Sequence, residues 1–154
     1  MVVGASSVTM PTTGGGPVAQ LAVGVLDANG VSQSVLRRDE PVTLQVQLHL
    51  LERIPDLDVA LYVINRSGVR VVNENASTSG VTIGRSPGDK DVRLTVPGLL
   101  PAGDYVVGVW LGTDHQTFAH GEALTLSILP LPTDRDTVHG AVRPAVRWST
   151  GEAS

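Results

Sequence analysis

Four titratable residues stand close together in the sequence and could do chemistry: Asp114, His115, His120 and Glu122. Carboxylates and imidazoles are the groups that bind divalent metals or move protons. Their spacing matches no diagnostic metal-ligand pattern, and they flank a short polar segment of the kind that joins two strands of a hairpin. We therefore expect a solvated hairpin loop at this position, and neither a metal site nor a catalytic site.

Four aspartates raise the same question for calcium: Asp89, Asp91, Asp134 and Asp136. Carboxylate oxygens suit Ca²⁺, but Asp is also an ordinary turn residue, and that is the interpretation we favour. The sequence contains no phosphate-binding Gly-rich loop with Lys, no Gly-x-Ser-x-Gly elbow, no His pair at metal-binding spacing and no cysteine. It thus predicts a protein that is not an enzyme and uses no cofactor.

Residues 105–112 show a clear alternation by two, which is typical of a strand. The side that begins at Tyr105 and ends at Leu111 is apolar, so it predicts a core face. The other side holds Trp110 between two glycines, which leaves the indole on an uncrowded surface where it could serve as a platform. The preceding segment 99–104 looks like the corner of an immunoglobulin-like sandwich, where a Tyr hydroxyl bonds back to nearby backbone.

The rest of the chain contains further alternating stretches. Apolar residues recur at every second position in 21–25, 42–50, 57–63, 92–96 and 124–128, with Gly, Pro, Asn or Asp between the stretches. Short strands around Val35 and at 81–83, a hairpin into 69–75 and a final segment at 138–148 complete the pattern. No stretch has apolar residues at helical spacing over three turns. We predict an all-β fold, an immunoglobulin-like two-sheet antiparallel β-sandwich of a jelly-roll-like variety.

In an immunoglobulin-like strand order, the strands at 57–64, 105–111 and 123–129 share one sheet. The outward residues that interest us there are Tyr62, Trp110, Thr125 and Ser127. Two aromatic rings with hydroxyls beside them offer stacking area for a sugar ring and hydrogen bonds for its hydroxyls. We predict a glycan-binding site at these four residues. A second subunit or the terminal strand could equally cover this face, because exposed apolar patches mark either kind of site.

The polar side of the 42–50 strand belongs to the opposite sheet in this order. Its Gln, Gln and His side chains also offer neutral donors and acceptors.

Composition limits the partners. The net charge is −4, with 11 Lys and Arg against 15 Asp and Glu, and Lys90 is the single lysine. No basic cluster could follow a phosphate backbone, so we expect no nucleic acid as partner. The longest uncharged apolar runs are strand-sized, so we expect no membrane insertion. The absence of cysteine fits a reducing compartment.

The domain boundaries follow from local composition. Residues 1–18 are small and polar with a Gly triplet and lack the features of a signal peptide, so they are typical of a flexible linker. We assign residues 19–149 to one β-sandwich domain and residues 150–154 to a tail.

Five segments in a fixed order carry a family resemblance: VLDANG at 25–30, EPVTL at 40–44, INRSGVRV at 64–71, LLPAGDYVVGV at 99–109 and the closing segment 140–148. Together they resemble the C-terminal domain of Wzt-type proteins, the nucleotide-binding subunits of ABC transporters that export O-antigen and related polysaccharides. The resemblance covers about residues 19–149.

The resemblance implies a non-catalytic, immunoglobulin-type β-sandwich that binds the exported polysaccharide, often at a modification of its non-reducing end. It also implies a homodimer with exchanged C-terminal strands, the transporter's ATPase and membrane subunits as partners, and a cytoplasmic location at the inner face of the plasma membrane. The family's ATPase domain is missing from this sequence, so we expect an isolated C-terminal domain or a stand-alone binding module. The alternative is a structural or protein-interaction β-sandwich with no glycan ligand.

Overall fold

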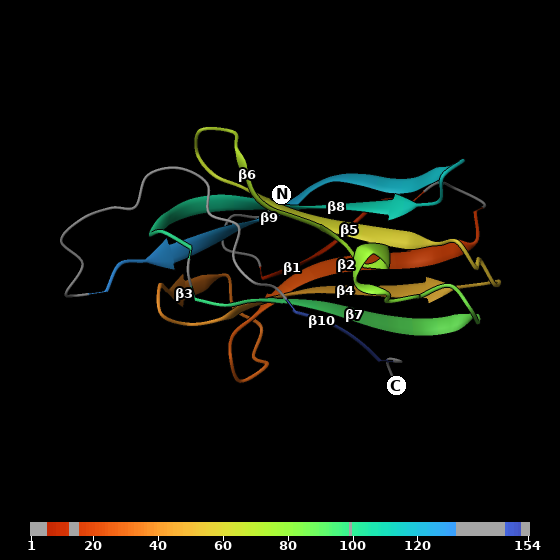
Figure 1. Cartoon of the computed structure of the whole chain (residues 1–154), viewed down its shortest axis with the longest axis horizontal. Helices are drawn as coiled ribbons and strands as arrows, with labels where there is room; N and C mark the ends of the chain where they lie inside the picture. Colours follow the sequence, from red (N-terminus) through yellow and green to blue (C-terminus); the bar gives the residue numbers. More distant parts are fainter. Residues whose placement is uncertain (1–5, 13–15, 99, 132–146, 152–154) are drawn as a thin grey trace.

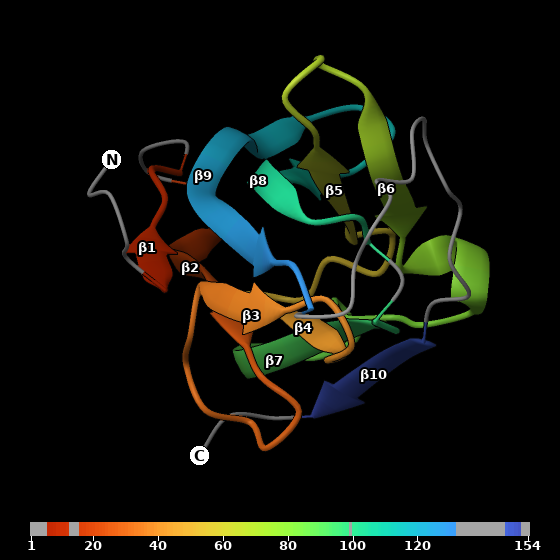
Figure 2. The ribbon, with the colours of Figure 1, turned by 90° about the vertical axis from the view of Figure 1, so that its left-hand side faces the viewer.

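A computed structural model describes residues 6–12, 16–98, 100–131 and 147–151. These residues form strands and one 3₁₀ turn, in two sheets packed face to face (Figures 1 and 2). The elements in chain order are β1 (Ser7–Thr9), β2 (Val18–Leu26), β3 (Val35–Arg37), β4 (Val42–Leu50), β5 (Asp58–Ile64), β6 (Arg70–Asn75), η1 (Ser77–Ser79), β7 (Gly88–Val96), β8 (Gly103–Gly112), β9 (Thr117–Leu129) and β10 (Arg147–Gly151).

The first sheet has the strand order β1-β2-β4-β7-β10, and the second has the order β3-β9-β8-β5-β6. Figure 2 looks along the sandwich and shows β9, β8, β5 and β6 in one layer, with β2, β4, β7 and β10 in the other. The prediction of an all-β, two-sheet sandwich is confirmed. The predicted grouping of the strands now labelled β5, β8 and β9 in one sheet is also confirmed.

The core lies between the two sheets because the long strands turn alternate side chains inward. Along β4 the inward residues from Val42 to Leu50 are at most 3% exposed. Along β8 the inward residues Val107, Val109 and Leu111 are fully buried. A shift of register by one residue would bring this apolar set to the surface, so the core fixes which side chains face outward.

Two strands differ from the sequence-based expectation. β3 pairs with β9 in parallel, so the second sheet is mixed and not purely antiparallel. β1 lies inside the segment that we expected to be a linker, and it pairs antiparallel with β2. β1 has only three residues, of which Val8 alone is apolar, so the strand is too short to show an alternating pattern in the sequence.

The expected strand at 81–83 is absent from the described residues, and β7 begins instead at Gly88. Ile83 is buried, and the next residue accepts a backbone hydrogen bond of 2.8 Å from Ile54, so this segment packs as an irregular loop. Asp89 and Asp91 consequently belong to β7 and are not turn residues. Of the expected final segment 138–148, only residues 147 and 148 lie within the described part, where β10 continues to Gly151.

A membrane-spanning helix, one both long and apolar enough to cross a bilayer, does not occur among the described residues.

The expected tyrosine corner is present at the start of β8. The hydroxyl of Tyr105 donates a hydrogen bond to the backbone carbonyl oxygen of Pro101. Tyr105 is 5% exposed, and burial raises the pKa of its phenol above the ordinary value. The hydrogen bond ties the 101–104 segment to the strand that carries Trp110.

We expect Tyr105→Phe to lower the free energy of unfolding by about 1 kcal/mol, because the Pro101 carbonyl loses its buried partner. A raised folded-state pKa contributes stability that is present below the unfolded pKa and is lost as the pH rises through the folded pKa. The variant should therefore lose stability less steeply than the parent above about pH 10. Denaturant unfolding at neutral and alkaline pH measures both effects. Equal alkaline slopes for the two proteins would contradict the buried hydroxyl.

Candidate functional site

The outer surface of the second sheet carries the aromatic residues that the sequence singled out. We call it the aromatic face and define it by five side chains from β5, β6, β8 and β9: Tyr62, Arg70, Trp110, His120 and Glu122. Strand register places them together, since Trp110 pairs with His120, and Gly108 lies between Tyr62 on one side and Glu122 on the other. This face therefore combines two rings, an imidazole and one charge of each sign.

Tyr62 lies flat on the sheet and is 4% exposed. Its ring covers Gly108 so closely that a Cβ at that position would overlap the ring atoms. The Arg70 guanidinium covers the ring from outside, with Cζ 4.0 Å from the ring centroid. Because both faces of the ring are occupied, Tyr62 supports the surface and offers no open platform.

Trp110 is half-buried and keeps a fixed orientation. Its Nε1 donates a hydrogen bond of 3.1 Å to Oγ1 of Thr117 on β9. A Cβ on Gly112 would lie 2.8 Å from Trp110 Cζ2, so the six-membered ring rests above that glycine. The glycine allows the indole to lie down along the sheet, as the spacing of the sequence predicted.

His120 and Glu122 belong to β9, on one flank of the hairpin loop. The His120 ring meets Tyr62 edge-on, with ring centroids 6.3 Å apart and an interplanar angle of 68°. Burial raises the pKa of Tyr62; the Arg70 charge lowers it and the Glu122 charge raises it. The two charges thus act on the phenol in opposite directions.

Thr125 and Ser127 share the outer surface but stand apart from Trp110. Thr125 pairs with Val106, which precedes Trp110 on β8 by four residues, or about 13 Å of strand. Ser127 lies still farther along, and its hydroxyl donates a 2.9 Å hydrogen bond to Asp104. The structure brings Tyr62 and Trp110 together and leaves the two hydroxyls farther along the same surface.

Arg70 and His120 were not part of the predicted glycan site. The signal for Arg70 lies in the hairpin between β5 and β6, whose register places it opposite Ile64, two residues along β5 from Tyr62. His120 was missed because β9 begins at Thr117, six residues before the strand expected at 123–129, and His120 is therefore a strand residue opposite Trp110.

Metal ligation finds no support in the described part of the chain, where no three His, Asp or Glu side chains converge. Asp114 and His115 lie exposed in the loop before β9, whereas His120 lies within that strand. Asp134 and Asp136 lie outside the described residues. The alternative covering element, the terminal strand β10, pairs with β7 in the opposite sheet.

We expect Arg70→Met, which keeps a long side chain beside the Tyr62 ring, and Glu122→Gln to move the pKa of Tyr62 in opposite directions. Loss of the guanidinium removes a charge that stabilises the phenolate, so the pKa rises, whereas loss of the carboxylate lowers it. The chain has two tyrosines, so a Tyr105→Phe background leaves Tyr62 as the single reporter. Ultraviolet absorbance of tyrosinate against pH gives the pKa, and Arg70→Lys is the charge-retaining control. Shifts of the same sign in both variants would contradict this arrangement.

Comparison with known protein families gives a match. The Wzt C-terminal domain family matches residues 12–144. Among solved structures, the "Crystal structure of the C-terminal domain of wzt" superposes with a TM-score of 0.58 at 13% identity, covering 85% of this chain and 82% of that one. The CARDB domain of the PF1109 protein from Pyrococcus furiosus, solved with di-metal ions, gives a TM-score of 0.43 at 14% identity, covering 72% and 94%. A search of curated proteins found no match.

The first structure supports the fold, and the family match spans most of the chain, including both sheets of the sandwich. The resemblance noted in the sequence is thereby confirmed, and the chain belongs to the Wzt C-terminal domain family.

Proposed function

We propose that this domain binds the polysaccharide that an ABC transporter exports, without catalytic activity of its own. Membership of the Wzt C-terminal domain family supports the association with polysaccharide export. The observation that carries the binding proposal is Trp110, a partly accessible indole on an outer strand face, held in place by Thr117. An indole with one side against the sheet offers its other side to the apolar face of a sugar ring.

Within this proposal the predicted site residues have different roles. Trp110 stacks on a sugar ring, and His120 beside it supplies a polar contact. Tyr62 forms the firm support next to Trp110, because Gly108 and Arg70 enclose its ring. Thr125 and Ser127 lie farther along the surface, so they would contact a later unit of an extended chain. A surface of this length suits a polymer better than a single small molecule.

The proposal also places the domain beside its transporter. Partners are the transporter's ATPase and membrane subunits, at the cytoplasmic side of the plasma membrane, where the finished polysaccharide is available before export. Recognition of a modified non-reducing end would let the domain select completed chains. The aromatic face has one exposed base and one exposed acid, so it does not favour a strongly charged chain.

We further propose a homodimer in which the C-terminal strand β10 is exchanged between subunits. In the structure β10 pairs antiparallel with β7 of its own chain, with Ser149 opposite Arg93. β10 of a second subunit would form the same ladder with β7 if it took the same register, because the hydrogen bonds join only backbone groups.

We expect Trp110→Ala to weaken binding of the exported polysaccharide by about tenfold, a loss typical of a stacked aromatic contact. Isothermal titration calorimetry with the purified polysaccharide measures it. Leu51→Ala is the matched control, since Leu51 is 60% exposed and lies in the turn after β4, away from the aromatic face. A folded Trp110→Ala protein with full affinity would refute the stacking role.

The exchange of β10 can be tested with a disulfide. The chain has no cysteine, so Arg93→Cys with Ser149→Cys introduces a single pair at directly opposed strand positions. After oxidation, an exchanged dimer should run as a covalent dimer on a denaturing gel without reductant. A quantitative disulfide confined to a monomer band would contradict the exchange. The single variant Ser149→Cys controls for random cross-linking.

A further inference from the structure

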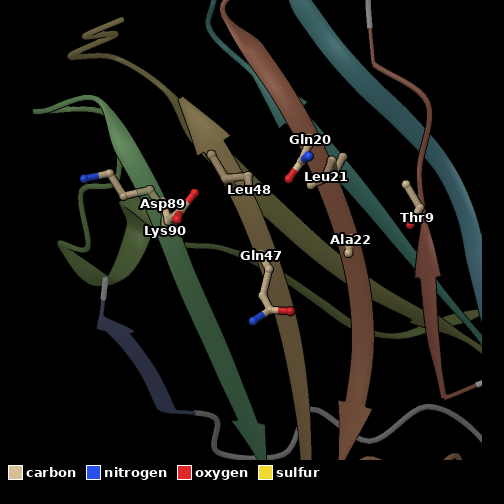
Figure 3. A pocket seen from close by; sticks show the side chains of 8 residues that line it. All are labelled: Thr9, Gln20, Leu21, Ala22, Gln47, Leu48, Asp89 and Lys90. Atoms are coloured by element: carbon tan, nitrogen blue, oxygen red, sulfur yellow. The ribbon is translucent and has the colours of Figure 1, made fainter. Parts of the chain in front are cut away.

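The outer face of the first sheet contains a hollow of about 450 Å³ (Figure 3). β2 contributes a small residue to the hollow, Ala22, between longer side chains of β1 and β4. Register places Thr9 and Gln47 on either side of Ala22, so the alanine forms the floor of the hollow. The volume lies within the range of small-molecule sites, roughly 300–1,000 Å³.

The side chains around the hollow are mainly neutral hydrogen-bonding groups. The exposed amides of Gln20 and Gln47 each provide donors and an acceptor, and Thr9 adds a hydroxyl. Groups that both donate and accept match the vicinal hydroxyls of a sugar, which do the same. The lining exposes no large apolar side chain, so it does not suit an apolar peptide.

The charge at the rim is negative. Asp89 lines the hollow, and its Oδ1 accepts a 2.6 Å hydrogen bond from Nδ1 of His49, which holds the carboxylate in place. Oδ2 of Asp89 has no hydrogen-bond partner among the described residues. The amino group of Lys90 donates to Ser86 at 3.0 Å and points away from the hollow in Figure 3. An acidic ligand would therefore meet repulsion, whereas a neutral polyol gains an acceptor.

We propose that this hollow is a second glycan-binding surface, which takes a neutral sugar unit by hydrogen bonding. The inference rests on the proposed function for its ligand class, but it concerns the opposite sheet and a different chemistry. The aromatic face binds by stacking, while the hollow binds through Gln47, Gln20 and Asp89. Two weak surfaces on one domain raise the overall affinity for a long chain that reaches both.

Nuclear magnetic resonance of isotope-labelled domain locates binding directly. The probes are maltotriose, mannotriose and galactotriose at about 10 mM, a concentration that detects millimolar affinity. Tri-galacturonic acid is the acidic control. At least one neutral probe should shift the side-chain amide of Gln47 and the backbone amide of Ala22, and the acidic probe should not.

Two variants make the test specific. Ala22→Leu fills the floor of the hollow and should weaken binding there about tenfold or more. Gln47→Ala removes the amide without adding bulk, so it gives the same answer if the leucine disturbs the fold. Trp110→Ala should leave binding at the hollow unchanged.

The outcomes separate the two proposals. Shifts confined to the aromatic face and abolished by Trp110→Ala would overturn the hollow and leave the proposed function standing. Binding at the hollow without any at Trp110 would overturn the stacking role of Trp110 and leave the second site standing. A neutral probe that binds Ala22→Leu and Gln47→Ala as well as the parent, or no shift at the hollow with any neutral probe, overturns the second site.

Discussion

Burial of one side of every long strand between the two sheets is the constraint on which the surface chemistry depends. In β8 the core takes Tyr105 and the aliphatic residues that alternate with it, so Gly108, Trp110 and Gly112 must face outward. In β2 the same rule sends Ala22 and Gly24 to the opposite surface. Because side chains alternate between the two sides of a strand, the residues buried in the core also fix which residues form the two outer faces.

Small residues then shape each of those faces. On the second sheet, Gly108 and Gly112 have no side chains, so the rings of Tyr62 and Trp110 can lie flat against the backbone. A larger residue at either glycine would collide with the ring above it. On the first sheet, the small side chain of Ala22 leaves a depression between longer polar side chains. Small residues therefore allow aromatic rings to lie flat on one face and leave a hollow on the other.

The sequence predicted the strands whose apolar residues alternate over several positions, the grouping of β5, β8 and β9 in one sheet, and the hydrogen bond of the Tyr105 hydroxyl. It did not predict β1, because three residues with one valine carry no periodic signal, nor the parallel pairing of β3, because strand direction depends on the path of the chain. Within the candidate site, the alternation of residue types predicted that Trp110 lies on the outer face of its strand. The covering of Tyr62 by Arg70 did not, because it depends on a side-chain conformation across two strands. The separation of Thr125 from Trp110 depends on register, which a bulge between Val107 and Gly108 adjusts.

The central claim, that Trp110 contacts the polysaccharide, can be tested by fluorine nuclear magnetic resonance of the domain labelled with fluorotryptophan. The chain has two tryptophans, and Trp148 is 9% exposed on β10 in the opposite sheet, so it serves as an internal reference. On titration with the exported polysaccharide, the resonance of Trp110 should shift or broaden while that of Trp148 stays in place. A saturating polysaccharide that leaves the Trp110 resonance unchanged would contradict the claim.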